Sequence, residues 1–513
     1  MREKLHFSRI FHDLVSKQKR RLAPPLLLLT FLRSGAEKID FSEKSEFSAP
    51  SIGDFMQKLV LVRPNYNSHI ITPPLGMGVL ASYLKKEGIE VKIIDGLRDN
   101  LNNEKILEII LSENPDAVGI TCLSAFYNEV VELSLMVKEN NLSCPCFIGG
   151  VHPTFLPYKT LVDSKADYVV CGEAEIALTQ LFKNNFKNHG IKGIYSLNDL
   201  KDEHQAFEKC EIIQNLDETP FTDWEQLNPN NYPKAPHGAI AKNFPIGVIT
   251  TTRGCPYECT FCASPQFYSR KIRYRSPENV IEEIKLLVDK YGVKEIHFED
   301  DNLTLNRAHI EKICNLILEN NIQISWACPN GIRADKVDEN LIRLMAKSGC
   351  YYFSYGIESA NTQILKNIKK LETIDTITNS IEIAEKCGIS CQGFFIFGLP
   401  GETKESIEET INYARKSKLS RAQFLILDVL PGCELWTTLK GQFTPDFAKN
   451  SYKEPEWLPN GLTKKDLLSA QSRAFKAFYL RPSVLFKLLK SVRPTQVKFL
   501  LKRLTEYRLI KNN

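Results

Sequence analysis

Residues 246–262 read Ile246-Gly-Val-Ile-Thr-Thr-Thr-Arg-Gly-Cys255-Pro-Tyr-Glu-Cys259-Thr-Phe-Cys262, and this stretch decides how the whole chain is interpreted. An apolar run, typical of a buried strand, leads into three cysteines separated by three and by two residues. A [4Fe–4S] cluster normally takes four cysteinates, so three thiols on one short loop leave one iron open for chemistry. The alternatives are scattered buried cysteines or a zinc knuckle, but no further Cys or His follows before His297. The spacing therefore predicts a cluster bound by Cys255, Cys259 and Cys262.

The motif resembles the signature of the radical S-adenosylmethionine (SAM) enzymes, Cys-x3-Cys-x2-Cys with an aromatic residue, here Phe261, before the third cysteine. The resemblance implies that the amine and carboxylate of SAM chelate the open iron. It also implies that one electron, from a donor such as flavodoxin or ferredoxin, cleaves SAM to a 5′-deoxyadenosyl radical that abstracts a substrate hydrogen.

Composition indicates a globular protein of several domains. Of its 513 residues 43% are hydrophobic and 25% are charged, and a net charge of +5 does not indicate a nucleic-acid partner. Fourteen irregularly spaced cysteines give no disulfide framework, and an iron–sulfur cluster needs a reducing compartment, so we expect the cytosol. No apolar run reaches the eighteen residues of a membrane-spanning helix.

Residues 1–55 are expected to be a disordered leader or an over-extended gene start. Arg20-Arg21 and the apolar run 24–32 loosely imitate a signal peptide. The run is short, however, and the long region before it contains Glu3 and Asp13.

Residues 56–186 alternate apolar strands with helical periods, as a parallel α/β sheet does. A flavodoxin-like sheet is predicted, with its ligand at the carboxyl ends of the strands. The five strands are expected at 58–62, 91–94, 117–121, 146–148 and 168–170. Residues 187–240 hold several Pro and Asn and have weak periodicity, so we expect a linker, with a short hairpin as an option.

A second alternation occupies residues 241–440. Strands are expected near 246–250, 294–298, 324–328, 351–355, 391–397 and 422–427. Six such units resemble the partial (β/α)6 barrel of the radical SAM family. Barrel chemistry takes place at the carboxyl ends of strands, and the cysteine loop directly follows the first strand.

Three further stretches follow barrel strands: His297-Phe-Glu-Asp-Asp-Asn302, Tyr355-Gly-Ile-Glu-Ser359 and Phe395-Ile-Phe-Gly-Leu-Pro-Gly-Glu-Thr403. Adjacent carboxylates repel, so the first stretch is either a solvated acid cluster or faces a cation or hydroxyl donors. Strand alternation would put its Glu299 and Asp301 on the same side. The third stretch departs from the family pattern Gly-x-Ile-x-Gly-x-x-Glu, since Phe394 replaces the first Gly and Glu402 is displaced by one. The resemblance implies SAM contacts from Phe261, Glu299, Asp301, Gly356, Glu358, Ser359, Gly398 and Gly401.

Glycine-rich turns follow strands of the first sheet and allow close backbone approach to a bulky ligand. Ahead of a radical SAM barrel they resemble the cobalamin-binding domain of B12-dependent radical SAM enzymes, a family that includes anaerobic magnesium-protoporphyrin ester cyclases and methyltransferases. The resemblance implies cobalamin contacts from Pro74, Gly76, Gly149, Gly150, His152, Gly172 and Glu173. The usual Asp-x-His-x-x-Gly motif is missing, since Asp95-Gly-Leu-Arg-Asp99 has no His and His69 is expected in a solvated loop. We therefore expect cobalt without a protein histidine below it.

The leading hypothesis is a cobalamin-dependent radical SAM enzyme that C-methylates an unactivated carbon of a small-molecule substrate, with no catalytic side chain assignable beyond the cluster. The alternatives are a radical cyclase or oxidative rearrangement of the magnesium-protoporphyrin type, and a non-catalytic cobalamin or iron–sulfur sensor. Residues 441–513 are predicted to be helical and basic. Their amphipathic stretches 484–490 and 497–504 either pack on the barrel or contact a membrane surface.

Overall fold

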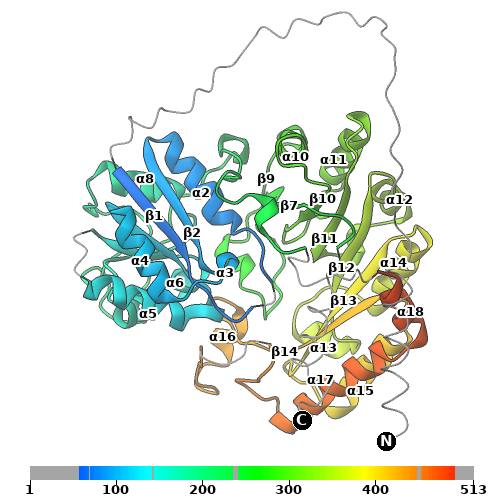
Figure 1. Cartoon of the computed structure of the whole chain (residues 1–513). Helices are drawn as coiled ribbons and strands as arrows, with labels where there is room; N and C mark the ends of the chain where they lie inside the picture. The colour runs from blue at the N-terminus through cyan, green and yellow to red at the C-terminus, as the bar shows by residue number, and fades with distance from the viewer. Residues whose placement is uncertain (1–56, 69, 141–143, 235–240, 448–451, 492–513) are drawn as a thin grey trace, which may run out of the picture. The chain divides into compact units, whose positions relative to one another are not determined.

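The computed structural model describes residues 57–68, 70–140, 144–234, 241–447 and 452–491 (Figure 1). The expected leader at 1–55, His69 and the basic stretch 497–504 lie outside these residues. Within the described residues, no helix is both long enough and apolar enough to cross a membrane.

The first sheet confirms the flavodoxin-like prediction. It has six strands in the order β2-β1-β3-β4-β5-β6, and the first five are parallel. Their bounds are β1 (Gln57–Arg63), β2 (Ile89–Asp95), β3 (Ala117–Thr121), β4 (Cys146–Gly149), β5 (Tyr168–Val170) and β6 (Ile194–Tyr195). The short β6 pairs antiparallel with β5 and lies in the segment expected to be a linker.

Apolar residues cover both faces of this sheet, as a parallel sheet requires. In β1, Leu59 and Leu61 point into one buried cluster and Val60 and Val62 into another. The helices between the strands are α2 (Leu75–Lys86), α3 (Gly96–Asp99), α4 (Asn103–Glu113), α5 (Tyr127–Glu139), α6 (Val151–Phe155), α7 (Pro157–Ser164) and α8 (Glu175–Lys183).

The second sheet has six parallel strands whose spatial order β14-β13-β12-β11-β10-β7 follows the chain. They are β7 (Ile246–Ile249), β10 (Glu295–Phe298), β11 (Ser325–Ile332), β12 (Cys350–Glu358), β13 (Ser390–Phe397) and β14 (Arg421–Ile426). The helices between them are α10 (Pro277–Tyr291), α11 (Arg307–Glu319), α12 (Glu339–Lys347), α13 (Thr362–Asn367), α14 (Ile374–Lys386) and α15 (Lys404–Lys416). The outer strands β7 and β14 do not pair with each other, so the barrel is open, as predicted.

Two short strands that the sequence did not predict close the cysteine loop. β8 (Thr252–Arg253) pairs antiparallel with β9 (Arg273–Tyr274), and α9 (Ser264–Phe267) lies within the loop that they enclose. The residues between these strands, including all three cysteines, therefore form a loop that is closed by this pair of two-residue strands. We call the β8–β9 pair the neck of the cysteine loop.

The segment between the two sheets is well packed. The side chain of Gln226 bonds to the backbone of β2 at Ile93 and Val91, and Trp224 is buried. Because Trp224 and Leu227 belong to a core cluster that includes residues of both sheets, this segment is part of the core.

The C-terminal helices begin with α16 (Glu434–Thr438) and continue with α17 (Lys464–Tyr479) and α18 (Pro482–Ser491). α17 packs on the barrel through buried Leu467, Phe475 and Phe478. The basic C-terminal region thus includes one helix that belongs to the core, and α18 follows it.

Candidate active site

The three cysteines lie on one loop at the carboxyl end of β7. All three are free thiols and half-buried. Burial raises the pKa of each thiol, that of Cys262 to about 12, so a bound metal would be needed to hold them as thiolates. Gly254 has φ of 108°, and a Cβ there would lie 2.0 Å from the carbonyl oxygen of Lys271. Only glycine therefore allows the loop to fold back on its own far side.

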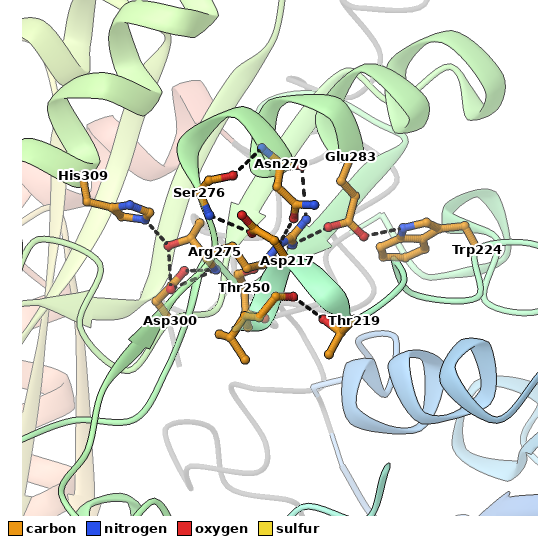
Figure 2. A network of polar contacts seen from close by, with 12 residues as sticks. Asp217, Thr219, Trp224, Thr250, Arg275, Ser276, Asn279, Glu283, Asp300 and His309 are labelled. Atoms are coloured by element: carbon orange, nitrogen blue, oxygen red, sulfur yellow. Dashed lines mark hydrogen bonds and ion pairs between the residues drawn. The ribbon is translucent and has the colours of Figure 1, made fainter. Parts of the chain in front are cut away.

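Asp300 holds one side of the neck of this loop (Figure 2). Its carboxylate accepts hydrogen bonds from the Thr251 backbone N–H at 3.0 Å and from the hydroxyls of Thr251 and Thr252 at 2.9 and 2.6 Å. His309 Nε2 lies 3.1 Å from the Thr251 hydroxyl. Burial raises the pKa of Asp300 to about 6, against the effect of these donors. The buried carboxylate thus fixes the chain where it leaves β7.

Arg275 holds the other side of the neck (Figure 2). Its backbone N–H donates to the carbonyl of Thr251, and its guanidinium reaches the carbonyl of Thr250 at 3.0 Å and Glu283 at 2.5 Å. Glu283 also accepts from the indole N–H of Trp224 at 2.9 Å. The exit of the loop is therefore tied to α10 and to the segment between the sheets.

Four buried charged side chains lie beside the cysteine loop, and we call them the charged cluster: Arg333, Glu358, Lys370 and Glu372. Lys370 Nζ lies 3.4 Å from both Glu358 and Glu372. The guanidinium of Arg333 stacks on Tyr257 of the loop, 3.7 Å from the ring centroid, and donates to the carbonyls of Lys370 and Leu371. Burial disfavours the charge on Lys370, but Glu358 and Glu372 outweigh it and raise the pKa of Lys370. Lys370 therefore stays charged within a set of two cations and two carboxylates.

Aromatic side chains gather at the carboxyl end of the first sheet, and we call them the aromatic cluster: Tyr66, Phe126, Tyr127, His152 and Phe447. The ring of His152 stacks on Tyr127 at 4.1 Å and meets Phe447 edge-on at 4.8 Å, while Tyr66 stacks on Phe126 at 4.5 Å. His152 is fully buried, and its Nδ1 lies 2.9 Å from the hydroxyl of Ser124. Its Nε2 is buried without a hydrogen-bond partner among the described residues.

Comparison with known proteins shows what these two regions belong to. One family model, the radical SAM superfamily, matches residues 249–414, and another, the B12 binding domain, matches residues 67–182. An uncharacterized methyltransferase of Pyrococcus horikoshii is 34% identical over 84% of this chain and 94% of its own. The chain belongs to the radical SAM superfamily.

Other relatives agree with this assignment. The radical SAM protein is 30% identical to the cytidylyl-2-hydroxyethylphosphonate methyltransferase of Streptomyces wedmorensis, over 74% of this chain and 81% of that one. Its fold matches that of the radical SAM methyltransferase TsrM from Kitasatospora setae, with a TM-score of 0.67, 18% identity and coverage of 83% and 90%. The cobalamin-dependent radical SAM enzyme OxsB matches with a TM-score of 0.68, 17% identity and coverage of 88% and 71%.

The protein is thus a radical SAM enzyme with a B12-binding domain, and its cofactors are a [4Fe–4S] cluster, SAM and cobalamin. The donor set of three thiols on one loop fits the cluster. In the described part of the chain these thiols do not converge into a group that could hold a single metal ion. The buried cations Arg333 and Lys370 lie beside this loop and are paired with Asp335, Glu358 and Glu372.

The structure places the expected SAM contacts in several different surroundings. Glu358 lies in the charged cluster and has a positive φ of 62°. Its carboxylate lies against Gly356, where a Cβ would come within 2.4 Å of Glu358 Oε1, so the glycine leaves room for this side chain. Ser359 is buried and bonds instead to Thr410 of α15 and to the backbone of Asn361. Phe261 packs in a separate apolar cluster beneath the loop.

The acidic run after β10 does not follow strand alternation, because the strand ends at Phe298. Asp300, which was not among the expected SAM contacts, is the buried carboxylate of this run. Asp301 is exposed and accepts a 2.6 Å hydrogen bond from Ser264 just beyond the cysteines, and Glu299 is half-buried. The run therefore fixes the cysteine loop through Asp300 and Asp301.

The turn after β13 is built on a buried carboxylate. Gly398 and Gly401 have φ of 93° and 82°, as a tight turn requires. Glu402 Oε2 accepts from the backbone N–H groups of Gly398 and Leu399, while Oε1 is buried without a partner among the described residues. Burial raises the pKa of Glu402 to about 8. The displaced family glutamate thus supports the turn from within.

Five of the seven residues expected to contact cobalamin lie where a ligand at the sheet end could meet them. Gly149 ends β4. Gly150 has φ of 114°, and a Cβ on this residue would lie only 2.6 Å from the carbonyl oxygen of Cys122. Pro74 precedes α2, and Gly76 is exposed with nothing within 4 Å of a Cβ. Gly172 follows β5 with φ of 105°.

The other two are differently placed. His152 is buried inside the aromatic cluster, and its Nε2 has no hydrogen-bond partner among the described residues. Glu173 faces the barrel and forms ion pairs with Arg253 and Arg273. Sequence reasoning missed these two arginines together with Arg333 and Lys370. The only signal was their position, since Arg253 directly precedes the cysteine loop and Lys370 follows α13.

Proposed function

We propose that this enzyme transfers a methyl group from cobalamin to a carbon atom of a small-molecule substrate. The observation that carries the proposal is the alignment with two methyltransferases, at 34% and 30% identity, over most of both chains. When bound, the reduced cluster and SAM supply the means to abstract a substrate hydrogen atom, and cobalamin supplies the methyl group.

The chain's own residues would position these groups. Cys255, Cys259 and Cys262 hold the cluster. Lys370 and Arg333 offset negative charge in a site from which water is largely excluded, where their interaction is stronger than in solvent. In the first domain, Gly149 and Gly150 let the backbone approach the corrinoid, and the aromatic cluster gives it an uncharged surface.

Ring closure or oxidative rearrangement is the second candidate. The anaerobic magnesium-protoporphyrin IX monomethyl ester cyclase of Cereibacter sphaeroides is 28% identical over 83% of this chain and 71% of its own. The two reactions differ in their products, because a methyl transfer consumes one SAM as methyl donor and a cyclisation does not.

The products of SAM therefore test the proposal. The protein would be reconstituted anaerobically with iron, sulfide and hydroxocobalamin, then given SAM and titanium(III) citrate. We expect both 5′-deoxyadenosine and S-adenosylhomocysteine, together with cluster and corrinoid absorption bands. Deoxyadenosine alone would favour cyclisation or rearrangement, and cofactor bands without any SAM cleavage would favour a sensor.

We also propose a cytosolic location with flavodoxin or ferredoxin as reductant, because an iron–sulfur cluster requires a reducing compartment. Replacing titanium(III) citrate by reduced flavodoxin checks the reductant: SAM cleavage should persist. Cleavage with the chemical reductant alone would contradict this part of the proposal.

Peripheral membrane contact is proposed for the C-terminal region. Leu485 is exposed on α18, and residues 481–513 hold nine Lys or Arg and a single Glu. Such a basic amphipathic segment is attracted to anionic lipid. Co-sedimentation with anionic vesicles should fall on truncation after residue 480, and equal sedimentation of the two proteins would contradict the contact.

A further inference from the structure

We propose that Glu173 and Glu175 of the cobalamin domain clamp the neck of the cysteine loop and so fix the position of the cluster relative to the corrinoid. Glu173 lies in the loop after β5 and Glu175 is the first residue of α8, at the end of the sheet where ligands of such a fold bind. Glu173 accepts from the guanidinium groups of Arg253 and Arg273, and Glu175 accepts from Arg253 at 2.8 Å. The two arginines are the residues through which the loop enters and leaves its hairpin.

The charges explain why two carboxylates are needed. Arg253 and Arg273 are directly opposite each other in the β8–β9 pair, and like charges in that arrangement repel. All four side chains are at most 16% exposed, so water cannot screen the repulsion. Two carboxylates against two guanidiniums make the neck neutral. The hairpin therefore closes only when the cobalamin domain supplies its pair of negative charges.

A second contact anchors the far part of the same loop. Lys209 Nζ donates to the carbonyl oxygens of Gln266 and Phe267 at the end of α9. Lys209 also lies over the ring of Phe155, 5.5 Å from its centroid, and Phe155 meets Phe267 edge-on at 6.5 Å. The side chain of Lys209 lies next to Gly172, where a Cβ would be 3.3 Å from its own Cβ. The loop is thus held at its neck and beyond the last cysteine by residues around Gly172.

Glu173 is accordingly a positioning residue, since both of its carboxylate oxygens accept from the guanidiniums of the loop. Removing its charge leaves two facing arginines with a single carboxylate. The neck should then open and the cluster should sit at a range of distances from the corrinoid. The inference depends on the cluster and cobalamin alone, so it stands or falls independently of the proposed methyl transfer.

The experiment compares full-length wild type with Glu173→Gln, both reconstituted with iron, sulfide and hydroxocobalamin. With cobalt as cob(II)alamin and the cluster reduced, the spin relaxation of cobalt reports its distance from the cluster. In Glu173→Gln we expect a weaker and more heterogeneous relaxation enhancement. We also expect iron to be lost to a chelator about tenfold faster, since breaking a buried pair is costly.

Three further variants separate positioning from general damage. Glu173→Asp keeps the charge and should restore most of the relaxation enhancement. The double variant Glu173→Gln/Arg273→Gln removes one charge of each sign, so it should retain iron better than Glu173→Gln alone. Glu295→Gln is the control, because this carboxylate is equally buried and bonded to His297 and Tyr351, but lies at the amino end of β10, away from the neck. It should lower stability and leave the cobalt relaxation unchanged.

Either of two results would overturn the inference. One is a wild-type relaxation enhancement in folded Glu173→Gln that still binds both cofactors. The other is an equal loss of enhancement in Glu295→Gln, which would show that removing any buried carboxylate of the protein has the same effect.

Discussion

The charged cluster of the barrel and the aromatic cluster of the first sheet occupy equivalent places, the carboxyl ends of parallel strands, and have opposite chemistry. The barrel brings two cations and two carboxylates together around Lys370, all of them buried. The first sheet brings four aromatic rings and a neutral histidine together around His152. We propose that the charged end serves a charged ligand and the aromatic end a large, mainly uncharged one.

The comparison shows that strand order places a site and that loop residues decide its ligand. The carboxyl end of a parallel sheet offers backbone N–H groups and a crevice for a ligand, whichever cofactor is bound. Buried charges persist only as matched sets, so they mark a site for a charged ligand such as SAM. Rings and glycines impose no charge and fit a corrinoid. Four predictions test whether the two ends are as independent as this difference suggests.

Replacing a cluster ligand has the largest expected effect, confined to the barrel. Cys262→Ala should abolish the cluster absorption and all SAM cleavage, because two thiols cannot hold the cubane. Cobalamin binding, measured by its absorption spectrum after gel filtration, should stay at the wild-type level. Cys387→Ala, another half-buried thiol, is the control and should change neither property. Loss of cobalamin from Cys262→Ala would show that the two ends are coupled.

Neutralising the central cation of the charged cluster comes next. Lys370→Met leaves Glu358 and Glu372 buried without their shared partner, which should lower the free energy of unfolding by about 3–5 kcal/mol. Urea denaturation of the apoprotein checks this value, and SAM binding by equilibrium dialysis should weaken as well.

Arg343→Met is the matched control for that change. Its pair with Glu339 lies on the surface of α12, where solvent screens an ion pair and leaves it a small contribution to stability. If Lys370→Met were no more destabilising than Arg343→Met, the charged cluster would not be the tightly paired set described above.

The sequence predicted the sheets far better than it predicted the clusters. All eleven parallel strands fall where apolar runs predict them, because a strand buried on both faces must be apolar along its length. The cysteine spacing likewise identified the cluster loop. Lys370 and Arg253 were missed because a buried cation looks like a surface one until its partner is known. The position of Glu173 after β5 was visible in the sequence, but its ion pairs with Arg253 and Arg273 were not.

A backbone test of the first sheet should have an intermediate effect. Gly150→Ala forces a left-handed φ on an alanine and puts its Cβ against the carbonyl oxygen of Cys122. The expected loss is at least about 2 kcal/mol of unfolding free energy, with weaker cobalamin binding. Gly76→Ala is the control, because its Cβ meets nothing and alanine favours the helix α2 by about 0.5–1 kcal/mol. A stable Gly76→Ala protein with reduced cobalamin affinity would show that the ligand itself approaches Gly76.

The smallest effect concerns pH and belongs to the aromatic cluster. Burial, with help from Lys159, lowers the pKa of His152 from 6.5 to about 3. Between these values the unfolded chain binds a proton that the folded chain does not, so stability falls as pH falls. The slope of the unfolding free energy is about 1.4 kcal/mol per pH unit, which amounts to a loss of about 2 kcal/mol at pH 5.

His309, with its pKa lowered to about 4, contributes a similar slope within the barrel. His152→Phe should therefore lower the measured slope by about 1.4 kcal/mol per pH unit between pH 6.5 and 5, whatever fixed cost the larger ring adds at pH 7.5. Urea titrations at pH 6.5 and at pH 5 measure this slope of the unfolding free energy. An unchanged slope in His152→Phe would mean that the folded protein protonates this histidine as readily as the unfolded chain does, and the contrast between a charged barrel end and an uncharged sheet end would fail.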